Sequence, residues 1–284
     1  MIMRILTIFL LLLSFLTSLS IGSDLPDPVK TELIASVKEI KPGDTFRVGV
    51  LFEIDPSWHI SWKNPGDSGL LTSVSFSFPE GFTVGELEWP IPIVFKQPGG
   101  IVDYGYKGSI LLLAEVKSSL KLSKATTINI NADVSWTSCS EICIPGKANL
   151  DLEIPLTDSS IKANAGEFEK WMDLLPTKSG SSKSPFIYNI DSKLNHDKNK
   201  SNFTLSLNWK TKAKDVEWIP DVNRALEIEN ISVDAENNDT EIIFSVLKLQ
   251  GQGISSNNID SLVTYVNEEG KRRGVSVSIP LKGL

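Results

Sequence analysis

The sequence predicts an all-β protein, with an immunoglobulin-like β-sandwich followed by a second, smaller β-sandwich-like domain. Short segments of alternating apolar and polar residues recur through about 130 residues, a number that suits the seven or so strands of such a sandwich. Gly, Pro, Asp and Asn bound these segments, which is typical of half-buried antiparallel strands. No helical periodicity separates them, and this excludes a parallel sheet with crossover helices.

The strands of the first region are expected where the alternation is clearest. These segments are residues 31–37, 46–54, 73–78, 110–116, 127–136 and 148–154. The pattern then changes, because Phe168, Trp171 and Met172 have helical spacing and Pro176 ends the run. Residues 177–184 are rich in Ser, Lys and Gly and are typical of a linker.

Alternation resumes after the linker, in a region that is richer in Asn and carries no cysteine. Its expected strands are residues 202–209, 216–219, 225–233, 240–249, 261–266 and 274–279. We therefore predict three parts after the N-terminus. They are a sandwich over 24–157, a short helix and linker over 158–185, and a second β-rich domain over 186–284 that acts as a spacer or docking module.

The N-terminus has the pattern of a secretory signal peptide over residues 1–23. Arg4 precedes an apolar run at 5–13, and small residues follow it. The run is short for a membrane-spanning helix, which needs roughly 20 residues. We therefore expect export, cleavage and no stable membrane insertion afterwards, with an uncleaved anchor as the alternative.

The charge balance excludes one class of partner. Lys and Arg number 28 against 35 Asp and Glu, for a net charge of −7. Basic clusters are absent from the sequence, so the electrostatic footprint of a nucleic-acid binder is missing. The acidity itself favours solubility.

Cys139 and Cys143 are the only cysteines, and they lie within residues 136–146 (WTSCSEICIPG). In an oxidising compartment two cysteines this close are expected to pair. In the chain-entropy model a closed loop of about five residues contributes only roughly 2 kcal/mol, against ~4.7 kcal/mol for 100 residues. A redox role is therefore favoured over a simple stabilising disulfide, which stays the alternative.

A metal site is a weaker alternative for the pair. Zinc or copper would need further ligands, and the two histidines, His59 and His196, have no ligand spacing from the cysteines. We predict no metal and no cofactor. Glu141 between the cysteines disfavours the thiolate, so the thiol should be modestly reactive and suited to a specific partner.

Residues 66–69 (GDSG) also occur around the nucleophile of trypsin-like proteases, and His59 lies nearby. That chemistry needs a serine, a histidine and a carboxylate together in space. The density of turn-forming residues favours a turn instead. His59 is interpreted as a partly buried strand residue that makes a hydrogen bond, with a proton relay near the disulfide as the alternative.

Four segments together resemble the N-terminal periplasmic domain of the DsbD-type thiol:disulfide interchange proteins. They are residues 58–70 (WHISWKNPGDSGL), 78–89 (FPEGFTVGELEW), 102–108 (VDYGYKG) and 136–146. The resemblance covers residues 30–157 closely and continues weakly to 216–220 (VEWIP). Two departures are a closer cysteine spacing than in the best-known members, and no membrane or thioredoxin-like domain after residue 284.

The resemblance implies an immunoglobulin fold and a periplasmic electron relay, as in the family's cytochrome c biogenesis role. Cys143 would form the mixed disulfide with a partner and Cys139 would resolve it. The implied partners are a membrane-embedded thiol reductase, here a separate protein or the rest of a longer ancestor, and periplasmic thioredoxin-fold proteins. Whether the protein is an enzyme stays open; if so, it is a thiol:disulfide oxidoreductase.

The resemblance also implies an aromatic cap over the disulfide. Tyr104 and Tyr106 bracket Gly105, between further glycines that would act as hinges. The alternative is that both tyrosines are ordinary core or edge residues.

The second class of function is an exported binding or adaptor module, for example one related to copper tolerance, with a merely structural disulfide. Exposed Trp58, Trp62 and Trp89 would suit glycan or peptide binding, whereas buried ones would be core. An inert disulfide would favour this class.

Overall fold

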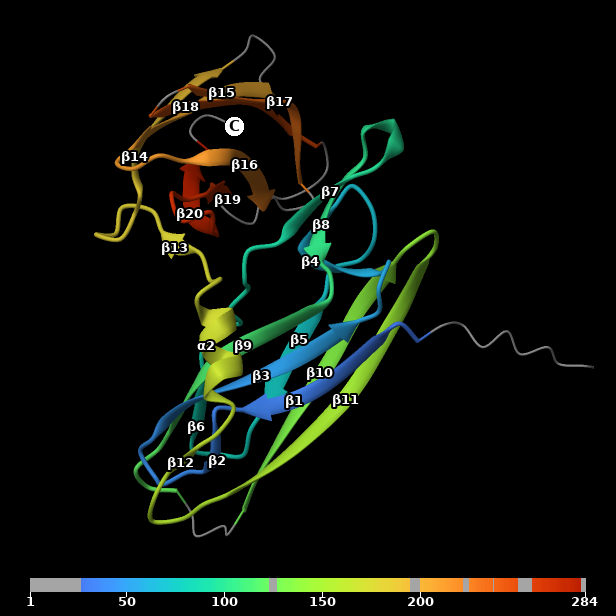
Figure 1. The fold of residues 1–284 in the computed structure, drawn as a ribbon, viewed down its shortest axis with the longest axis vertical. Helices are drawn as coiled ribbons and strands as arrows, with labels where there is room; N and C mark the ends of the chain where they lie inside the picture. Colours follow the sequence, from blue (N-terminus) through green and yellow to red (C-terminus); the bar gives the residue numbers. More distant parts are fainter. Residues whose placement is uncertain are drawn as a thin grey trace, which may run out of the picture.

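The computed structural model describes residues 27–122, 127–194, 200–221, 225–236, 238–249 and 257–281. The predicted signal peptide, residues 1–23, and His196 lie outside these ranges. Antiparallel sheets make up most of the described chain (Figure 1). The predicted all-β class is therefore confirmed.

Two sheets form the first region. The smaller sheet has the order β1-β3-β9-β6, with bounds Val29–Ala35, Thr45–Ile54, Ser109–Ser118 and Phe82–Val84. The larger has the order β11-β10-β4-β8-β7, with bounds Cys143–Pro155, Thr127–Cys139, His59–Gly66, Val102–Tyr106 and Ile93–Lys96. Strand β5 (Ser73–Ser77) also pairs with β10, and β2 (Val37–Glu39) pairs with β12 (Ile161–Lys162).

The alternation in sequence produces the core of this region. In β10 the apolar residues at 128, 130, 132 and 134 are buried, while Asn129, Asn131 and Asp133 are exposed, because successive side chains of a strand point to opposite faces. Phe52 of β3 meets Trp136 of β10 edge to face, with ring centroids 5.8 Å apart. Apolar side chains from both sheets thus fill one core between them.

The predicted helix is present as α2 (Ala165–Met172), which buries Phe168 and Trp171 against the first core. A single 3-10 turn, η1 (Pro98–Gly100), connects β7 to β8. The helix therefore belongs by packing to the first region.

Two further sheets form the C-terminal region around a core of their own. One has the order β14-β15-β18-β17, with bounds Phe186–Leu194, Lys200–Trp209, Asp239–Lys248 and Leu226–Glu236. The other has the order β13-β20-β19-β16, with bounds Thr177–Lys178, Arg272–Pro280, Asn258–Val266 and Lys214–Asp221. Phe244 stacks on both Phe203 and Trp218 between these sheets. The division into domains at 158–185 stays a prediction.

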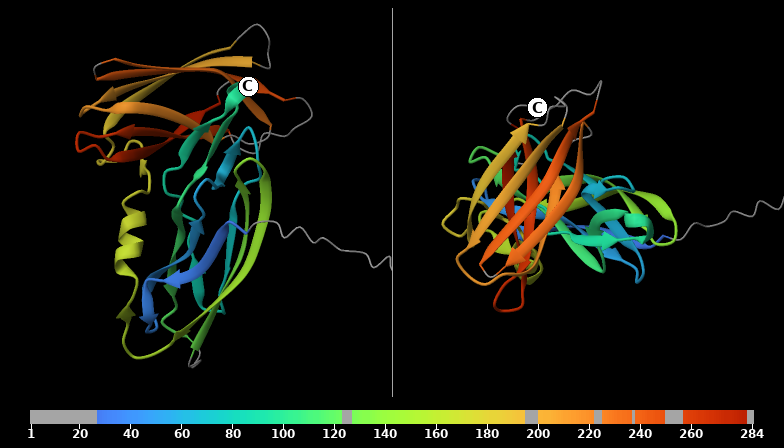
Figure 2. Two further views of the ribbon diagram at one scale, coloured as in Figure 1. Left: turned by 45° about the vertical axis from the view of Figure 1, so that its right-hand side comes forward. Right: turned by 90° about the horizontal axis from the view of Figure 1, so that it is seen from above.

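The two regions touch through specific contacts. Lys63 forms an ion pair with Asp221, and the Asn64 side-chain amide donates to the Pro220 carbonyl over 2.7 Å. The Arg272 guanidinium donates to a carbonyl of the first region. Figures 1 and 2 show the C-terminal sheets lying across the end of the first sandwich where the β7–β8 hairpin and the β10–β11 turn are found. No helix among the described residues is long and apolar enough to cross a membrane.

Candidate redox site

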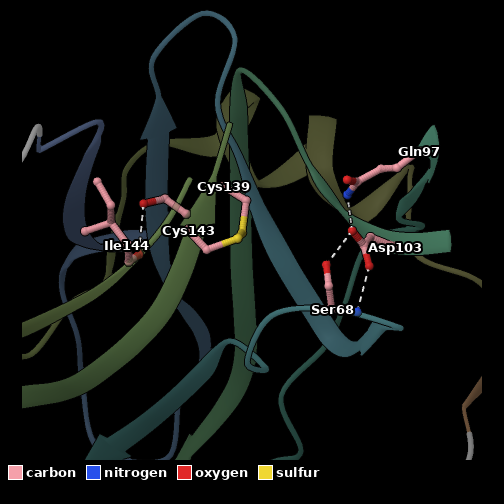
Figure 3. Close-up of a disulfide and its surroundings, with 7 residues drawn as sticks. Ser68, Gln97, Asp103, Cys139, Cys143 and Ile144 are labelled. Carbon is pink, nitrogen blue, oxygen red and sulfur yellow. Dashed lines mark hydrogen bonds between the residues drawn. A yellow bond between two sulfur atoms is a disulfide. The ribbon is translucent and has the colours of Figure 1, made fainter. Parts of the chain in front are cut away.

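The two cysteines lie at the tip of the β10–β11 hairpin. Cys139 ends β10, Cys143 begins β11, and the strand register places them opposite each other. A disulfide joins them, with an S–S distance of 2.05 Å and a Cα–Cα distance of 4.1 Å (Figure 3). The Ser140 backbone N–H donates to the Ile142 carbonyl over 3.0 Å within the connecting turn. The predicted pairing is therefore present.

The two sulfur-bearing residues differ in exposure. Cys139 is 5% exposed, whereas Cys143 is exposed and its neighbour Ile142 is 55% exposed. The Ser138 hydroxyl donates to the Ile144 carbonyl over 3.2 Å and ties the base of the turn together. Cys143 is therefore the more accessible residue of the disulfide.

His59 belongs to the same row of side chains as the disulfide. Cys139 is opposite His59 of β4 on one side and Cys143 of β11 on the other. Residues directly opposite in antiparallel strands share a face, with Cβ atoms about 4.5–5.5 Å apart. The order His59, Cys139, Cys143 therefore crosses three strands on one face of the sheet.

The His59 ring stacks on Phe95 of β7, with centroids 4.4 Å apart and planes 27° apart. Among the described residues its side chain makes this contact in place of the predicted hydrogen bond. Burial lowers the pKa of the His59 imidazole; the Asp103 carboxylate raises this pKa, and the Lys107 ammonium lowers it. The ring is therefore held toward its neutral form.

Asp103 of β8 is a buried carboxylate beside this row, at 3% exposure. It accepts hydrogen bonds from the Ser68 backbone N–H over 2.9 Å, from the Ser68 hydroxyl over 2.7 Å and from the Gln97 side-chain amide (Figure 3). Ser68 is the serine of the GDSG segment, and Gly66 and Gly69 on either side have positive φ. Residues 66–69 thus form a turn that is hydrogen-bonded to β8, as their composition predicts.

The predicted cap residues, Tyr104 and Tyr106, lie within strand β8 and are buried. Tyr106 is opposite Ile60, one position along from the row of His59. By alternation both tyrosines therefore point to the other face of the sheet, away from the disulfide. This placement favours the packing interpretation over the cap, because each tyrosine already has fixed neighbours there.

Those neighbours are specific. The Tyr106 hydroxyl donates to the Pro90 carbonyl over 2.7 Å, and burial raises the pKa of this phenol well above its ordinary range. Tyr104 meets Trp62 edge to face and lines a cavity of about 810 Å³ between the two regions. Burial, followed by the Asp67, Glu217 and Asp103 carboxylates, raises the pKa of Tyr104 to about 12.

Phe95 is an aromatic residue on the disulfide face, and no motif in the sequence marks it. It is opposite Asp103 in the β7–β8 pairing and so shares the face of His59. A Cβ placed on Gly105 would lie 2.1 Å from the Ile60 carbonyl oxygen and 3.4 Å from the Phe95 ring. Gly105 therefore lets β4 and β8 approach closely. The signal in the sequence was the apolar 93–95 run before a Pro-Gly-Gly turn.

The tryptophans proposed for a binding surface are mostly core. Trp62 is 1% exposed, and Trp58 and Trp89 are partly buried against the first core. Within the described ranges, no group of three or more His, Cys, Asp or Glu side chains comes together in a way that could hold a metal ion.

Comparison with known proteins finds one family model that matches the first region. Residues 26–155 match the family described as "Thiol:disulfide interchange protein DsbD, N-terminal". This segment, less than half of the chain, is similar to that family. The match ends at the last residue of β11, so it includes the disulfide hairpin, His59 of β4 and both tyrosines of β8.

Solved structures support the fold. The N-terminal periplasmic domain of ScsB from Proteus mirabilis aligns over 90% of this chain and 94% of its own, at 18% identity and a TM-score of 0.61. A marsupial T cell receptor aligns over 88% of this chain and 100% of its own, but its 11% identity and TM-score of 0.21 are too low to show a shared fold. No curated protein matches the sequence.

Proposed function

We propose that this protein is an exported thiol–disulfide relay. The Cys139–Cys143 pair receives two electrons from a membrane-embedded thiol reductase and passes them to periplasmic thioredoxin-fold proteins. The observation that carries the proposal is the hairpin-tip disulfide in a segment that is similar to a thiol:disulfide interchange family.

The unequal exposure of the two cysteines supports distinct roles for them. Thiol–disulfide exchange proceeds by attack of a thiolate on a disulfide sulfur through a mixed disulfide. The exposed Cys143 is the residue that a partner's sulfur can approach, and the buried Cys139 is held one strand away to resolve the adduct. Cys143 is therefore the attacking residue and Cys139 the resolving one.

The position of the disulfide supports exchange over stabilisation. It closes a loop between two residues that the β10–β11 ladder already holds opposite each other along its whole length. Such a short loop removes little entropy from the unfolded chain. The disulfide is thus placed where it adds little to the fold and is open to a partner.

The test is a trapping experiment on the mature chain. Reduced Cys139→Ser protein is mixed with a purified, oxidised thioredoxin-fold disulfide isomerase, and adducts are separated on a non-reducing gel. We expect an adduct that dithiothreitol releases and that mass spectrometry maps to Cys143, because the resolving thiol is gone. The matched variant Cys143→Ser should trap much less.

Each other outcome has a definite meaning. If only Cys143→Ser accumulates an adduct, the two roles are exchanged. If neither variant forms an adduct and the wild-type disulfide stays oxidised in the presence of reduced isomerase, the relay is excluded and the adaptor alternative stands.

A further inference from the structure

We propose that His59 is the proton acceptor for the Cys139 thiol during resolution of the mixed disulfide. This inference rests on the proposed function, because it assigns a proton-transfer group to the same cysteine pair. It starts from the row His59, Cys139, Cys143 across β4, β10 and β11.

The chemical need for a base follows from the burial of Cys139. Burial in apolar surroundings raises the pKa of a thiol, and only the thiolate is a nucleophile. At 5% exposure Cys139 has little contact with water that could take its proton. The exposed Cys143 has no such need. The resolving step is therefore the one that a neighbouring base would accelerate.

His59 has the placement and the protonation state for this task. His59 is directly opposite Cys139 in the strand register, where Cβ atoms are about 4.5–5.5 Å apart. The stack on Phe95 shows that the ring leans toward β7 while the disulfide is closed, so it must turn toward β10 to accept the Cys139 proton. Burial keeps the pKa of His59 low, so that the imidazole is neutral and free to accept a proton at neutral pH.

The charged neighbours of His59 come from β8 and the turn after it. Asp103 favours the protonated ring and would stabilise the imidazolium once it forms, whereas Lys107 disfavours it. From β7 the neighbour is the uncharged Phe95, and from β10 and β11 it is the two cysteines. His59 is thus the one imidazole beside the pair among the described residues.

The reaction balances in two steps. The Cys143 thiolate attacks one sulfur of the partner's disulfide, a Cys143–partner bond forms, and the partner's second sulfur leaves as a thiolate. The Cys139 thiol then gives its proton to His59, its thiolate attacks the Cys143 sulfur, and the partner's sulfur leaves with the bonding electron pair. The imidazolium returns the proton to this thiolate or to water. The pair is oxidised by two electrons and the partner is reduced.

The test separates the two steps without any protein partner. Reduced protein is mixed with 5,5′-dithiobis(2-nitrobenzoic acid) in a stopped-flow instrument, and each step releases one coloured thiolate. In His59→Gln we expect the second phase to slow about 100-fold at neutral pH, as for loss of a general base. The first phase should change less than about twofold, because Cys143 is exposed.

The pH dependence of the second-phase rate distinguishes a proton acceptor from a packing residue, because loss of packing alone would not change its shape. The wild-type second phase should rise with pH through the lowered pKa of His59 and then level off, since the neutral ring is the active form. In His59→Gln it should rise only at the higher pH where the Cys139 thiol itself ionises. His59→Phe keeps a ring against Phe95 and should behave like His59→Gln.

His59→Phe is also the matched control, because it keeps an aromatic ring beside Phe95 and removes the basic nitrogen. If His59→Phe resolves at the wild-type rate, His59 acts by packing and the inference is wrong. Near-ultraviolet circular dichroism checks that each variant is folded. The trapping experiment tests the relay and the stopped-flow experiment tests His59. Either proposal can therefore fail while the other holds.

Discussion

The two β-regions of this protein are built alike, and only one of them carries a disulfide. Each has two antiparallel sheets around a core with clustered aromatic side chains. Both cysteines of the sequence lie in the first region, at the tip of one hairpin. The C-terminal core is formed by apolar side chains and carries no cysteine. This difference supports the proposal that the disulfide of the first region serves in exchange more than in stabilisation.

The largest test of this comparison removes one aromatic residue from each core. Phe52→Ala and Phe244→Ala each delete a side chain that is at most 1% exposed, and each should cost about 3–5 kcal/mol of unfolding free energy. Phe52 supports Trp136, three residues before Cys139 on β10. We therefore expect Phe52→Ala to speed reduction of the disulfide by dithiothreitol several-fold, and Phe244→Ala to leave that rate unchanged.

The measurements are urea unfolding and the rate of thiol appearance under native conditions. If disulfide reduction is accelerated equally in both variants, the two regions open together and the disulfide does not depend on the first core alone. If both variants lose the same stability and only Phe52→Ala is reduced faster, the disulfide is coupled to the first core.

Substitution of Gly105 tests how far the site depends on the close approach of β4 and β8. An added Cβ would lie 2.1 Å from the Ile60 carbonyl oxygen, so Gly105→Ala must push β8 away from β4. We expect a loss of about 1–3 kcal/mol, typical of overpacking, together with a changed reaction rate of the reduced pair. Gly166→Ala in α2 is the control, because its Cβ would meet nothing within 4 Å. A neutral Gly105→Ala would contradict the close approach.

Reduction of the disulfide should have a modest effect on stability. The chain-entropy model gives roughly 2 kcal/mol for so short a loop. Circular dichroism should therefore show an unchanged β signal after dithiothreitol, while thiol counting reports two free cysteines. Loss of the β signal on reduction would make the disulfide a structural element and would favour the adaptor alternative.

In the first region the sequence predicts the long strands and β5, and it places His59 in a strand, but it gives no bounds for β4, β7 or β8, which build the site. Strands β3, β9, β10 and β11 have many alternating residues, so their periodicity is unmistakable. Strand β4 begins at His59 and runs into turn-forming residues with a bulge, and β7 has only four residues. Their existence depends on pairing with distant strands, which local patterns do not encode.

The cysteine pair and the cap differ in how far the sequence predicts them. Pairing of Cys139 with Cys143 follows from their spacing and compartment alone. The cap prediction at Tyr104 and Tyr106 treats Gly105 as a hinge, whereas the structure uses it for contact between β8 and β4. Which face a side chain points to depends on strand register, and so the stack of Phe95 on His59 could only be seen in the structure.

The smallest expected effect concerns the ion pair that joins the two regions. Lys63 and Asp221 have side chains 38% and 24% exposed, and such partly exposed pairs contribute at most about 1 kcal/mol. A double-mutant cycle with Lys63→Met and Asp221→Asn should give a coupling of this size at low salt. Most of it should vanish in about 1 M salt, where the Debye length is only about 3 Å.

The control cycle uses Lys271 and Glu269, a pair within one turn of the C-terminal region, 3.1 Å apart and more than half exposed. Its coupling should be near zero, because both side chains are solvated. A larger coupling at Lys63–Asp221 that persists in salt would mean that the interface is effectively buried. The two regions would then act as one body, and the C-terminal sheets would help to hold β4, and with it His59, in place beside the disulfide.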